Sequence, residues 1–178
     1  MKTIYFVRHG ESQSNIRQII SGSKDNIGLT DKGREQAKRA GQDLADKHIE
    51  LVVCSPLIRT VDTATIIARE IGYDPANIIV NPLLVERDYG IYDGGPNEVY
   101  RDLLAGNVVH ESVETTQQMH ARFTKALEWL KNLKENTIVV VSHGGARRAI
   151  HVINEGLDHS HMYKLESFGN GEIYQFTL

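Results

Sequence analysis

Two histidines in this chain follow hydrophobic runs in the same way. The run Thr3–Val7 leads into Arg8-His9-Gly10, and the run Thr137–Val141 leads into Ser142-His143-Gly144-Gly145. Both runs are rich in β-branched or aromatic residues, which is typical of buried strands. Open α/β sheets bind ligands at the carboxyl edge of their strands. If the two strands are neighbours, the two histidines therefore face each other across one pocket.

Three more charged residues are candidates for the same pocket. Arg8 lies beside the first histidine, and Arg59 lies in the first turn of an expected helix that begins at another strand end. Glu86 lies in a loop just after the apolar stretch Leu83-Leu84-Val85. Two histidines, two arginines and one carboxylate can thus converge at one edge of a sheet.

This set of side chains suits phosphoryl transfer. The spread negative charge of a transferring phosphate is stabilised by preorganised cations, and Arg8 and Arg59 carry planar forks that match phosphate oxygens. A neutral His9 imidazole can attack phosphorus, while His143 donates hydrogen bonds to the equatorial oxygens. A carboxylic acid such as Glu86 can protonate the leaving alkoxide. This chemistry requires no metal and no cofactor.

The elements that would position these residues alternate along the chain. Hydrophobic periodicity predicts helices over 31–47, 57–71, 113–133 and 146–154 and strands over 3–7, 49–54, 77–80, 137–141, 163–165 and 172–176. Ser55-Pro56 resembles an N-cap followed by proline at the first helical position. This alternation predicts an α/β fold, a three-layer sandwich with a mostly parallel central sheet flanked by helices.

Residues 81–112 are the least regular part of the chain. They contain Gly90, Gly94, Gly95 and Gly106 and two of the four prolines. The segment is too long for a plain connector in a compact domain, so we expect a substrate loop or a mobile lid.

Length and composition limit the possible classes of protein. The 178 residues suffice for one domain over 1–178, and 40% hydrophobic and 24% charged residues are close to globular norms. The net charge of −3 and the scattered lysines and arginines argue against binding of nucleic acid or an anionic membrane. The start of the chain lacks a signal-peptide pattern, no apolar run reaches ~20 residues, and Cys54 is the only cysteine. We therefore expect a cytoplasmic location, and the sequence does not indicate an oligomeric state.

The chain resembles the histidine phosphatase superfamily, the phosphoglycerate-mutase-like group, over nearly its whole length. The resemblance rests on Arg8–Ser12 with Asn15, Leu29–Ala37, Ser55–Thr60 with Thr63-Ala64, Leu84–Gly90, Glu111-Ser112 and Ser142–Gly145. It implies that His9 is the phosphorylated nucleophile and Glu86 the proton donor. It also implies a phosphate pocket of Arg8, Arg59 and His143, lined further by Asn15, Ser21, Gly22 and Gly144.

Two features favour a phosphatase over the mutases of this group. Such mutases are typically longer, with a segment that closes over a bisphosphate, and tend to carry Asn where this chain has Gly145. One stretch departs from the family pattern, because Tyr92-Asp93-Gly94 only approximates the usual aromatic-acidic-Gly sequence. The resemblance therefore implies a phosphatase that acts on a small phosphorylated substrate.

Several alternatives remain open from the sequence. The protein could be a phosphoglycerate-type mutase, or a phospho-ligand binding protein without turnover. Glu11 or Asp88 could replace Glu86 as the acid. His151, His159 and His161 have spacing that a metal site could use, but no acidic or thiol partner of clear geometry accompanies them, so we predict no metal. Cys54, at the end of an apolar strand, is predicted to be a buried structural thiol.

Overall fold

The computed structural model describes residues 1–166 and 168–178, with the side chains of all of these except Ala105 and Tyr163. A five-stranded sheet lies at its centre, in the order β3-β2-β4-β1-β5. The strands are β1 (Thr3–Arg8), β2 (Leu51–Cys54), β3 (Ile79–Val80), β4 (Thr137–Ser142) and β5 (Ile173–Thr177). The first four are parallel, and β5 pairs antiparallel with β1. The predicted α/β fold with a mostly parallel sheet is confirmed.

Six α-helices and several 3-10 turns surround the sheet in the described part of the chain. The helices are α1 (Gln13–Arg17), α2 (Asp31–Leu44), α3 (Ile58–Glu70), α4 (Tyr100–Ala105), α5 (Thr116–Lys131) and α6 (Gly144–Asn154). The turns are η1 (Pro75–Asn77), η2 (Pro82–Leu84), η3 (Gly90–Tyr92), η4 (Asn97–Val99) and η5 (His159–Lys164). None of the described helices is both long and apolar enough to cross a bilayer.

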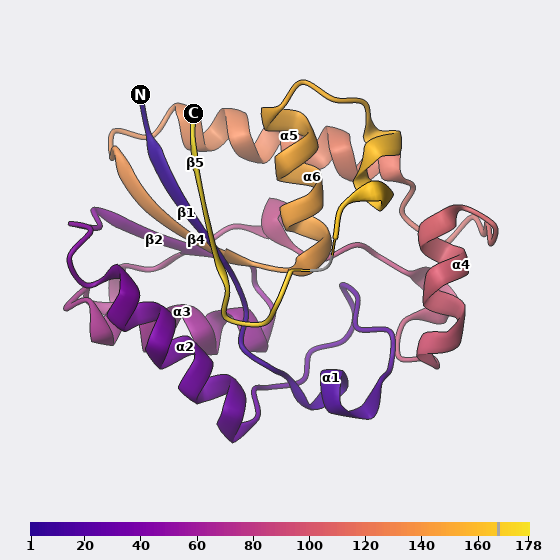
Figure 1. Cartoon of the computed structure of the whole chain (residues 1–178), viewed down its shortest axis with the longest axis horizontal. Helices are drawn as coiled ribbons and strands as arrows, with labels where there is room; N and C mark the ends of the chain where they lie inside the picture. The colour runs from indigo at the N-terminus through magenta and orange to yellow at the C-terminus, as the bar shows by residue number, and fades with distance from the viewer. Residues whose placement is uncertain (167) are drawn as a thin grey trace.

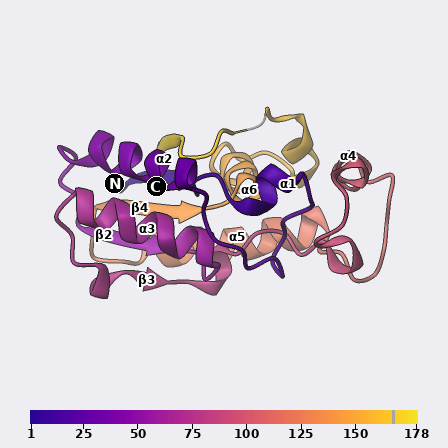
Figure 2. The same cartoon turned by 90° about the horizontal axis from the view of Figure 1, so that it is seen from below.

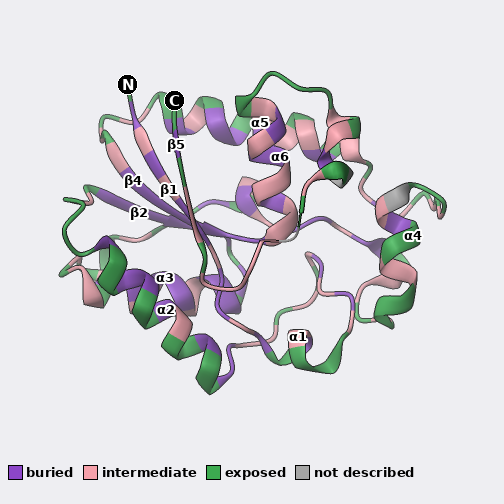
Figure 3. Cartoon of the chain, viewed as in Figure 1, coloured by how far each residue is buried: buried purple, intermediate pink, exposed green. Residues whose placement is uncertain are grey.

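The strands separate two apolar cores by the alternation of their side chains. In β1, Ile4 and Phe6 pack with α5 and α6, whereas Val7 packs with α2 and α3 on the other face. Figure 1 shows α5 and α6 above the strands and α2 and α3 below them. The central strands β2 and β4 are purple along most of their length in Figure 3, since both faces are covered. This three-layer arrangement is the predicted sandwich.

The carboxyl ends of the parallel strands point to one end of the molecule. In Figure 2 the β4 arrow points toward the side where α6 and α4 lie. A third, smaller apolar cluster lies outside the two main cores and consists of Ile20, Tyr89, Leu103 and Val113, with partly buried residues packed against it. We call residues 87–113, which carry most of this cluster, the cap segment.

Three of the predicted elements are wrong, one of them entirely and two in their bounds. The strand predicted over 163–165 is absent, because the Asp158 side chain accepts a hydrogen bond from the Ser160 N–H and begins the turn η5 instead. The strand predicted over 77–80 is only Ile79–Val80, since Asp74 caps η1 just before it. The long helix begins at Thr116 rather than at 113, because Thr115 and Gln118 form a capping box.

The predicted N-cap at Ser55 is also wrong. Helix α3 begins at Ile58, with Leu57 at the N-cap and no side-chain cap hydrogen bond. The Ser55 hydroxyl lies 2.8 Å from Nε2 of His143 instead. Ser55, which the local sequence predicts as a helix cap, therefore binds His143 at the edge of the sheet.

Candidate active site

The pairing of β1 with β4 brings the two strand-end histidines together. The parallel register places Arg8 opposite Ser142, so His9 and His143 are the next residues on two adjacent strands. Their ring centroids are 5.3 Å apart at an interplanar angle of 64°. The predicted meeting of two strand-end histidines is what the structure shows.

The hydrogen bond of the His9 ring determines which of its nitrogens carries the proton. Its Nδ1 lies 2.7 Å from the carbonyl oxygen of Gly10, and since a carbonyl only accepts, Nδ1 carries the proton. The unprotonated Nε2 is then free to attack. Burial lowers the pKa of His9 well below its ordinary value, and the charges of Arg59 and Arg8 lower it further. His9 is therefore a neutral imidazole at pH 7, as nucleophilic attack requires.

The two arginines are fixed by backbone carbonyls. The Arg8 guanidinium donates to the carbonyl of Phe168. The Arg59 guanidinium donates to the carbonyls of Asp25 and Gly22, the latter at 3.1 Å. Burial lowers the pKa of both, but a guanidinium stays protonated in proteins. Neither Nε has a hydrogen-bond partner among the described residues, so both cations retain capacity for an anion.

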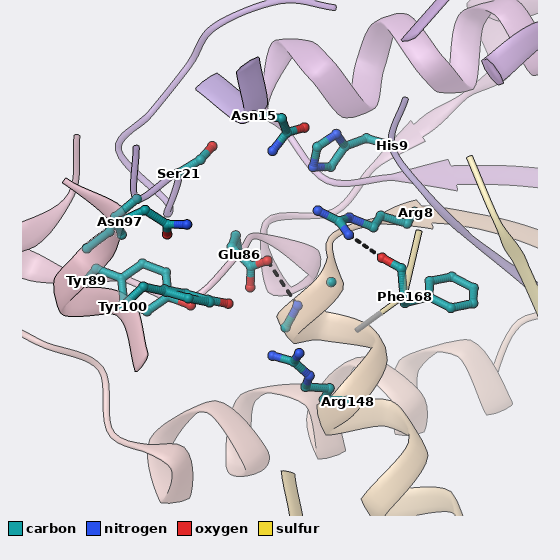
Figure 4. Close-up of a pocket in the computed structure, with 13 residues that line it drawn as sticks. Arg8, His9, Asn15, Ser21, Glu86, Tyr89, Asn97, Tyr100, Arg148 and Phe168 are labelled. Carbon is teal, nitrogen blue, oxygen red and sulfur yellow. Dashed lines mark hydrogen bonds between the residues drawn. The ribbon is translucent and has the colours of Figure 1, made fainter. Parts of the chain in front are cut away.

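The side chain of Glu86 lies against the N-terminus of α6. Its carboxylate accepts hydrogen bonds from the N–H of Arg87 at 2.9 Å and from the N–H of Gly145 at 3.1 Å. The dashed line from Glu86 in Figure 4 ends on the first turn of this helix. Gly145 permits this contact, because a Cβ there would lie 2.3 Å from Oε1 of Glu86. The carboxyl group is thus held at the cavity by backbone donors.

A cavity of about 210 Å³ lies in front of these residues. Its lining consists of Arg8, His9, Asn15, Ile20, Ser21, Glu86, Tyr89, Asn97, Tyr100, Gly144, Gly145, Arg148 and Phe168. Figure 4 shows the Glu86 carboxylate in the middle of this space, with Arg8 on one side and the tyrosines on the other. Arg59 and His143 lie outside the lining, but the charge of Arg59 acts on His9 and the ring of His143 packs against the His9 ring.

The alternative acids are engaged elsewhere. Glu11 accepts hydrogen bonds from Thr30 at 3.0 Å and Lys32 at 2.9 Å. Asp88 accepts from the N–H of Gly90 at 2.7 Å and pairs with Lys24. Neither lines the cavity. Of these three carboxyl groups, only that of Glu86 lines the cavity.

The predicted substrate-binding residues divide into two groups. Asn15, Ser21 and Gly144 line the cavity, and among the described residues nothing accepts a hydrogen bond from Asn15 Nδ2. Gly22 is not among the lining residues, and its N–H donates to Asp93 at 2.7 Å while its carbonyl accepts from Arg59. Gly22 therefore positions Arg59 and does not line the cavity.

Several lining residues were missed by reasoning from the sequence. Tyr89, Asn97 and Tyr100 come from the cap segment, whose path no local pattern predicts. Arg148 reaches the cavity from α6, and Figure 4 shows its guanidinium below Glu86. Its position four residues after Gly144, one helical turn, could have indicated it.

The remaining candidates lie away from the site. His151 Nδ1 lies 3.0 Å from the Tyr174 hydroxyl, and His159 Nδ1 lies 3.1 Å from the Thr116 hydroxyl. Within 1–166 and 168–178, no three His, Cys, Asp or Glu residues come together as a metal would require. Cys54 is buried in β2, and burial raises the pKa of its thiol to about 12, so it is a structural residue.

The chain is similar in sequence to known proteins. The family model of the histidine phosphatase superfamily (branch 1) matches residues 4–178. A 2,3-bisphosphoglycerate-dependent phosphoglycerate mutase of Bartonella bacilliformis is 31% identical over 99% of this chain and 93% of its own length. An agropine synthesis reductase of Rhizobium rhizogenes is 35% identical over 99% of this chain, which spans only 39% of that protein.

A solved structure has a similar fold. The mycobacterial glucosyl-3-phosphoglycerate phosphatase in complex with VO3 superimposes with a TM-score of 0.85 over 98% of this chain and 92% of its own. Its sequence identity is 24%, so this likeness concerns the fold.

Proposed function

The chain belongs to the histidine phosphatase superfamily, and we propose that it is a metal-independent phosphomonoester hydrolase that acts through a phosphohistidine on His9. The observation that carries the proposal is the hydrogen bond from His9 Nδ1 to Gly10 O. It leaves Nε2 as the lone-pair nitrogen of a buried, neutral imidazole between two fixed cations.

In the first step Nε2 of His9 attacks phosphorus, and the P–O bond to the substrate alcohol breaks. Glu86 gives its proton to the leaving alkoxide and becomes a carboxylate. Arg8, Arg59 and His143 stabilise the charge on the equatorial oxygens during this transfer. In the second step water attacks the phosphohistidine, Glu86 takes a proton from that water, and the N–P bond breaks. Inorganic phosphate leaves, and His9 and Glu86 return to their starting states.

Small phosphorylated molecules are the substrates that this cavity suits. Its volume of about 210 Å³ accommodates a phosphate with a compact organic group. Tyr89, Asn97 and Tyr100 of the cap segment form the wall opposite Arg8 and would contact that group. We propose that residues 81–112 form the substrate loop or lid.

A phosphoglycerate-type mutase is the second candidate, and the relative from Bartonella bacilliformis favours it. Gly145 argues against it. A side chain at this position, such as the Asn that the resemblance associates with mutases, would displace Glu86 from its contact with the helix terminus. A third candidate is a protein that binds phosphorylated ligands without turnover. Binding alone would not require a nucleophile, an acid and two cations at one site.

The test is phosphate release from p-nitrophenyl phosphate with and without a strong chelator, for the wild type and His9→Ala. We expect chelator-resistant release from the wild type and none from the variant, whose circular dichroism stays native. Retained activity in the variant would mean a different nucleophile. No release from folded wild type would favour the mutase or the binding protein, which a bisphosphate-primed mutase assay would separate.

A further inference from the structure

Ser55 and His143 follow neighbouring strands and meet at the sheet edge. Cys54 of β2 lies opposite Val141 of β4, so the residues after these two strands are close together, as the adjacent strands in Figure 1 show. The Ser55 Oγ lies 2.8 Å from His143 Nε2, and neither side chain has any exposed surface. Water therefore cannot replace either partner of this hydrogen bond.

The backbone of Ser55 is fixed on both sides. Its N–H donates to the carbonyl of Val141 at 3.0 Å, and its carbonyl accepts from the Thr60 hydroxyl at 2.8 Å. The side chain can then turn only about χ1 and about the Cβ–Oγ bond, which sets the position of the hydroxyl hydrogen. In the described part of the chain, the hydroxyl has no other partner than His143 Nε2.

The other nitrogen of His143 is the informative one. Nδ1 is buried and has no hydrogen-bond partner among the described residues, while the ring packs against His9. Burial, and then the charges of Arg59 and Arg8, hold the pKa of His143 well below its ordinary value. The ring is therefore neutral, and one of two tautomers must be present.

The two tautomers differ in what they leave unpaired. If Ser55 donates to Nε2, the ring proton is on Nδ1, and the single unpaired group is a donor available to a phosphate oxygen. If Nε2 donates to Ser55, a buried hydroxyl hydrogen has no acceptor, and Nδ1 carries a lone pair where a bound anion would need a donor. Buried polar groups are rarely left without a partner, and a lone pair repels an anionic oxygen.

We propose that Ser55 is a positioning residue that donates to Nε2 of His143 and so fixes the tautomer with the proton on Nδ1. His143 then meets a bound phosphate as a hydrogen-bond donor. The proposal deepens the proposed function, because it assumes that the anion beside His143 is the phosphate of the substrate. Ser55 itself does not touch the reacting atoms.

The experiment is ¹⁵N NMR of histidine-labelled protein, in which the signals of His143 are assigned by their loss in His143→Gln. In the wild type at neutral pH, we expect Nδ1 to show the shift of a protonated ring nitrogen and Nε2 that of an unprotonated one. In Ser55→Ala we expect both signals to move toward a mixture of tautomers. The affinity for inorganic phosphate should fall by about tenfold, which corresponds to the loss of one hydrogen bond.

Ser142→Ala is the matched control. Ser142 is equally buried and directly precedes His143, but its hydroxyl donates to the Leu84 carbonyl at 2.7 Å rather than to a ring. The tautomer of His143 should not change in this variant. If Ser55→Ala does not fold, Ser55→Cys, which keeps a weak donor, should give an intermediate tautomer ratio.

Protonated Nε2 in the wild type, unchanged signals in Ser55→Ala, or equal changes in Ser142→Ala would each overturn the proposal. These readings use the resting protein and do not depend on turnover. An inactive wild type with the expected tautomer would therefore contradict the proposed function and leave the role of Ser55 intact.

Discussion

The two walls of the cavity are built from very different parts of the fold. His9, His143 and Ser55 follow three adjacent strands whose two faces are covered by α2 and α3 and by α5 and α6. The opposite wall belongs to the cap segment, residues 87–113, which consists of short turns and α4. Among the described residues, this segment contributes only Tyr89, Leu103 and Val113 as buried members of its apolar cluster, which Ile20 completes from outside.

This difference separates two tasks. The groups that we propose to hold a reacting phosphorus atom lie where the backbone is fixed by a continuous hydrogen-bonded sheet. Groups that would meet the rest of the substrate lie on a segment with few buried apolar contacts, which makes local opening less costly. Under the proposed function, the wall that performs the chemistry is thus the stable one, and the wall that would select the substrate is the adaptable one.

Among the variants that test this comparison of the two walls, Glu86→Gln is expected to have the largest effect, a loss of kcat/KM. Glutamine keeps the size of the side chain but cannot donate the proton that an alkyl alcohol needs on leaving. We expect kcat/KM for an alkyl phosphate to fall by about 10²–10⁴. The loss should be much smaller for p-nitrophenyl phosphate, whose leaving group needs no proton. Steady-state assays with both substrates measure the ratio.

Glu11→Gln is the control for Glu86→Gln, since Glu11 binds Thr30 and Lys32 away from the cavity. Glu11→Gln should leave kcat/KM unchanged for both substrates. Equal losses for the alkyl and aryl phosphates in Glu86→Gln would show that this carboxylate positions the site rather than protonating the leaving group.

The sequence predicted the stable wall better than the adaptable one, for a physical reason. The run Thr137–Val141 is buried on both faces beyond its first residue, and Thr3–Val7 is buried on one face and partly buried on the other, so their composition indicates strands without tertiary information. The parallel alternation of elements then implies that their carboxyl ends meet. The sequence alone therefore predicts that His9 and His143 lie together.

The cap segment could not be predicted in this way, because its residues reach the site through tertiary contacts. Tyr89, Asn97 and Tyr100 follow no helical or strand period and line the cavity because the chain turns back over the sheet edge. Ser55 shows the same limit from the other side. Its local sequence predicts a helix cap, and only the neighbouring strand explains why it binds His143.

Asp93 joins the two walls, and Asp93→Ala should give the second largest effect. Its carboxylate accepts hydrogen bonds from the N–H groups of Gly22 at 2.7 Å and Lys24 at 2.9 Å. The same loop holds Arg59 through the Gly22 and Asp25 carbonyls. Without this carboxylate the loop loses two charge-assisted hydrogen bonds. We expect the affinity for inorganic phosphate, measured by calorimetry, to fall by about tenfold.

Glu98→Gln removes the same charge from the same segment. Glu98 is exposed, and no hydrogen bond involving its side chain is present in the described part of the chain, so this variant should bind phosphate like the wild type. Asp93→Asn retains one acceptor and should give an intermediate affinity. If Glu98→Gln weakens binding as much as Asp93→Ala does, the effect is general electrostatics and the two walls are not coupled through Asp93.

The last and smallest effect is a change in global stability. We expect Leu103→Ala to lower the free energy of unfolding less than Leu130→Ala does. Both leucines are almost fully buried, Leu103 in the cap cluster and Leu130 in the core under α5. Leu130→Ala should lower the free energy of unfolding by about 2–5 kcal/mol and reduce Tm by several degrees. Leu103→Ala should change Tm much less, because the cap cluster can open while the two main cores stay folded.

Native-state hydrogen exchange separates the two outcomes for Leu103→Ala. Amides of α4 should exchange faster in this variant, while amides of β1 and β4 keep the protection of the wild type. KM for an aryl phosphate should rise modestly, since the substrate wall opens more often, and kcat should change little. If instead the β4 amides lose protection together with those of α4, the cap segment unfolds only with the sheet. The adaptable wall would then be as stable as the catalytic one, and the distinction between them would not hold.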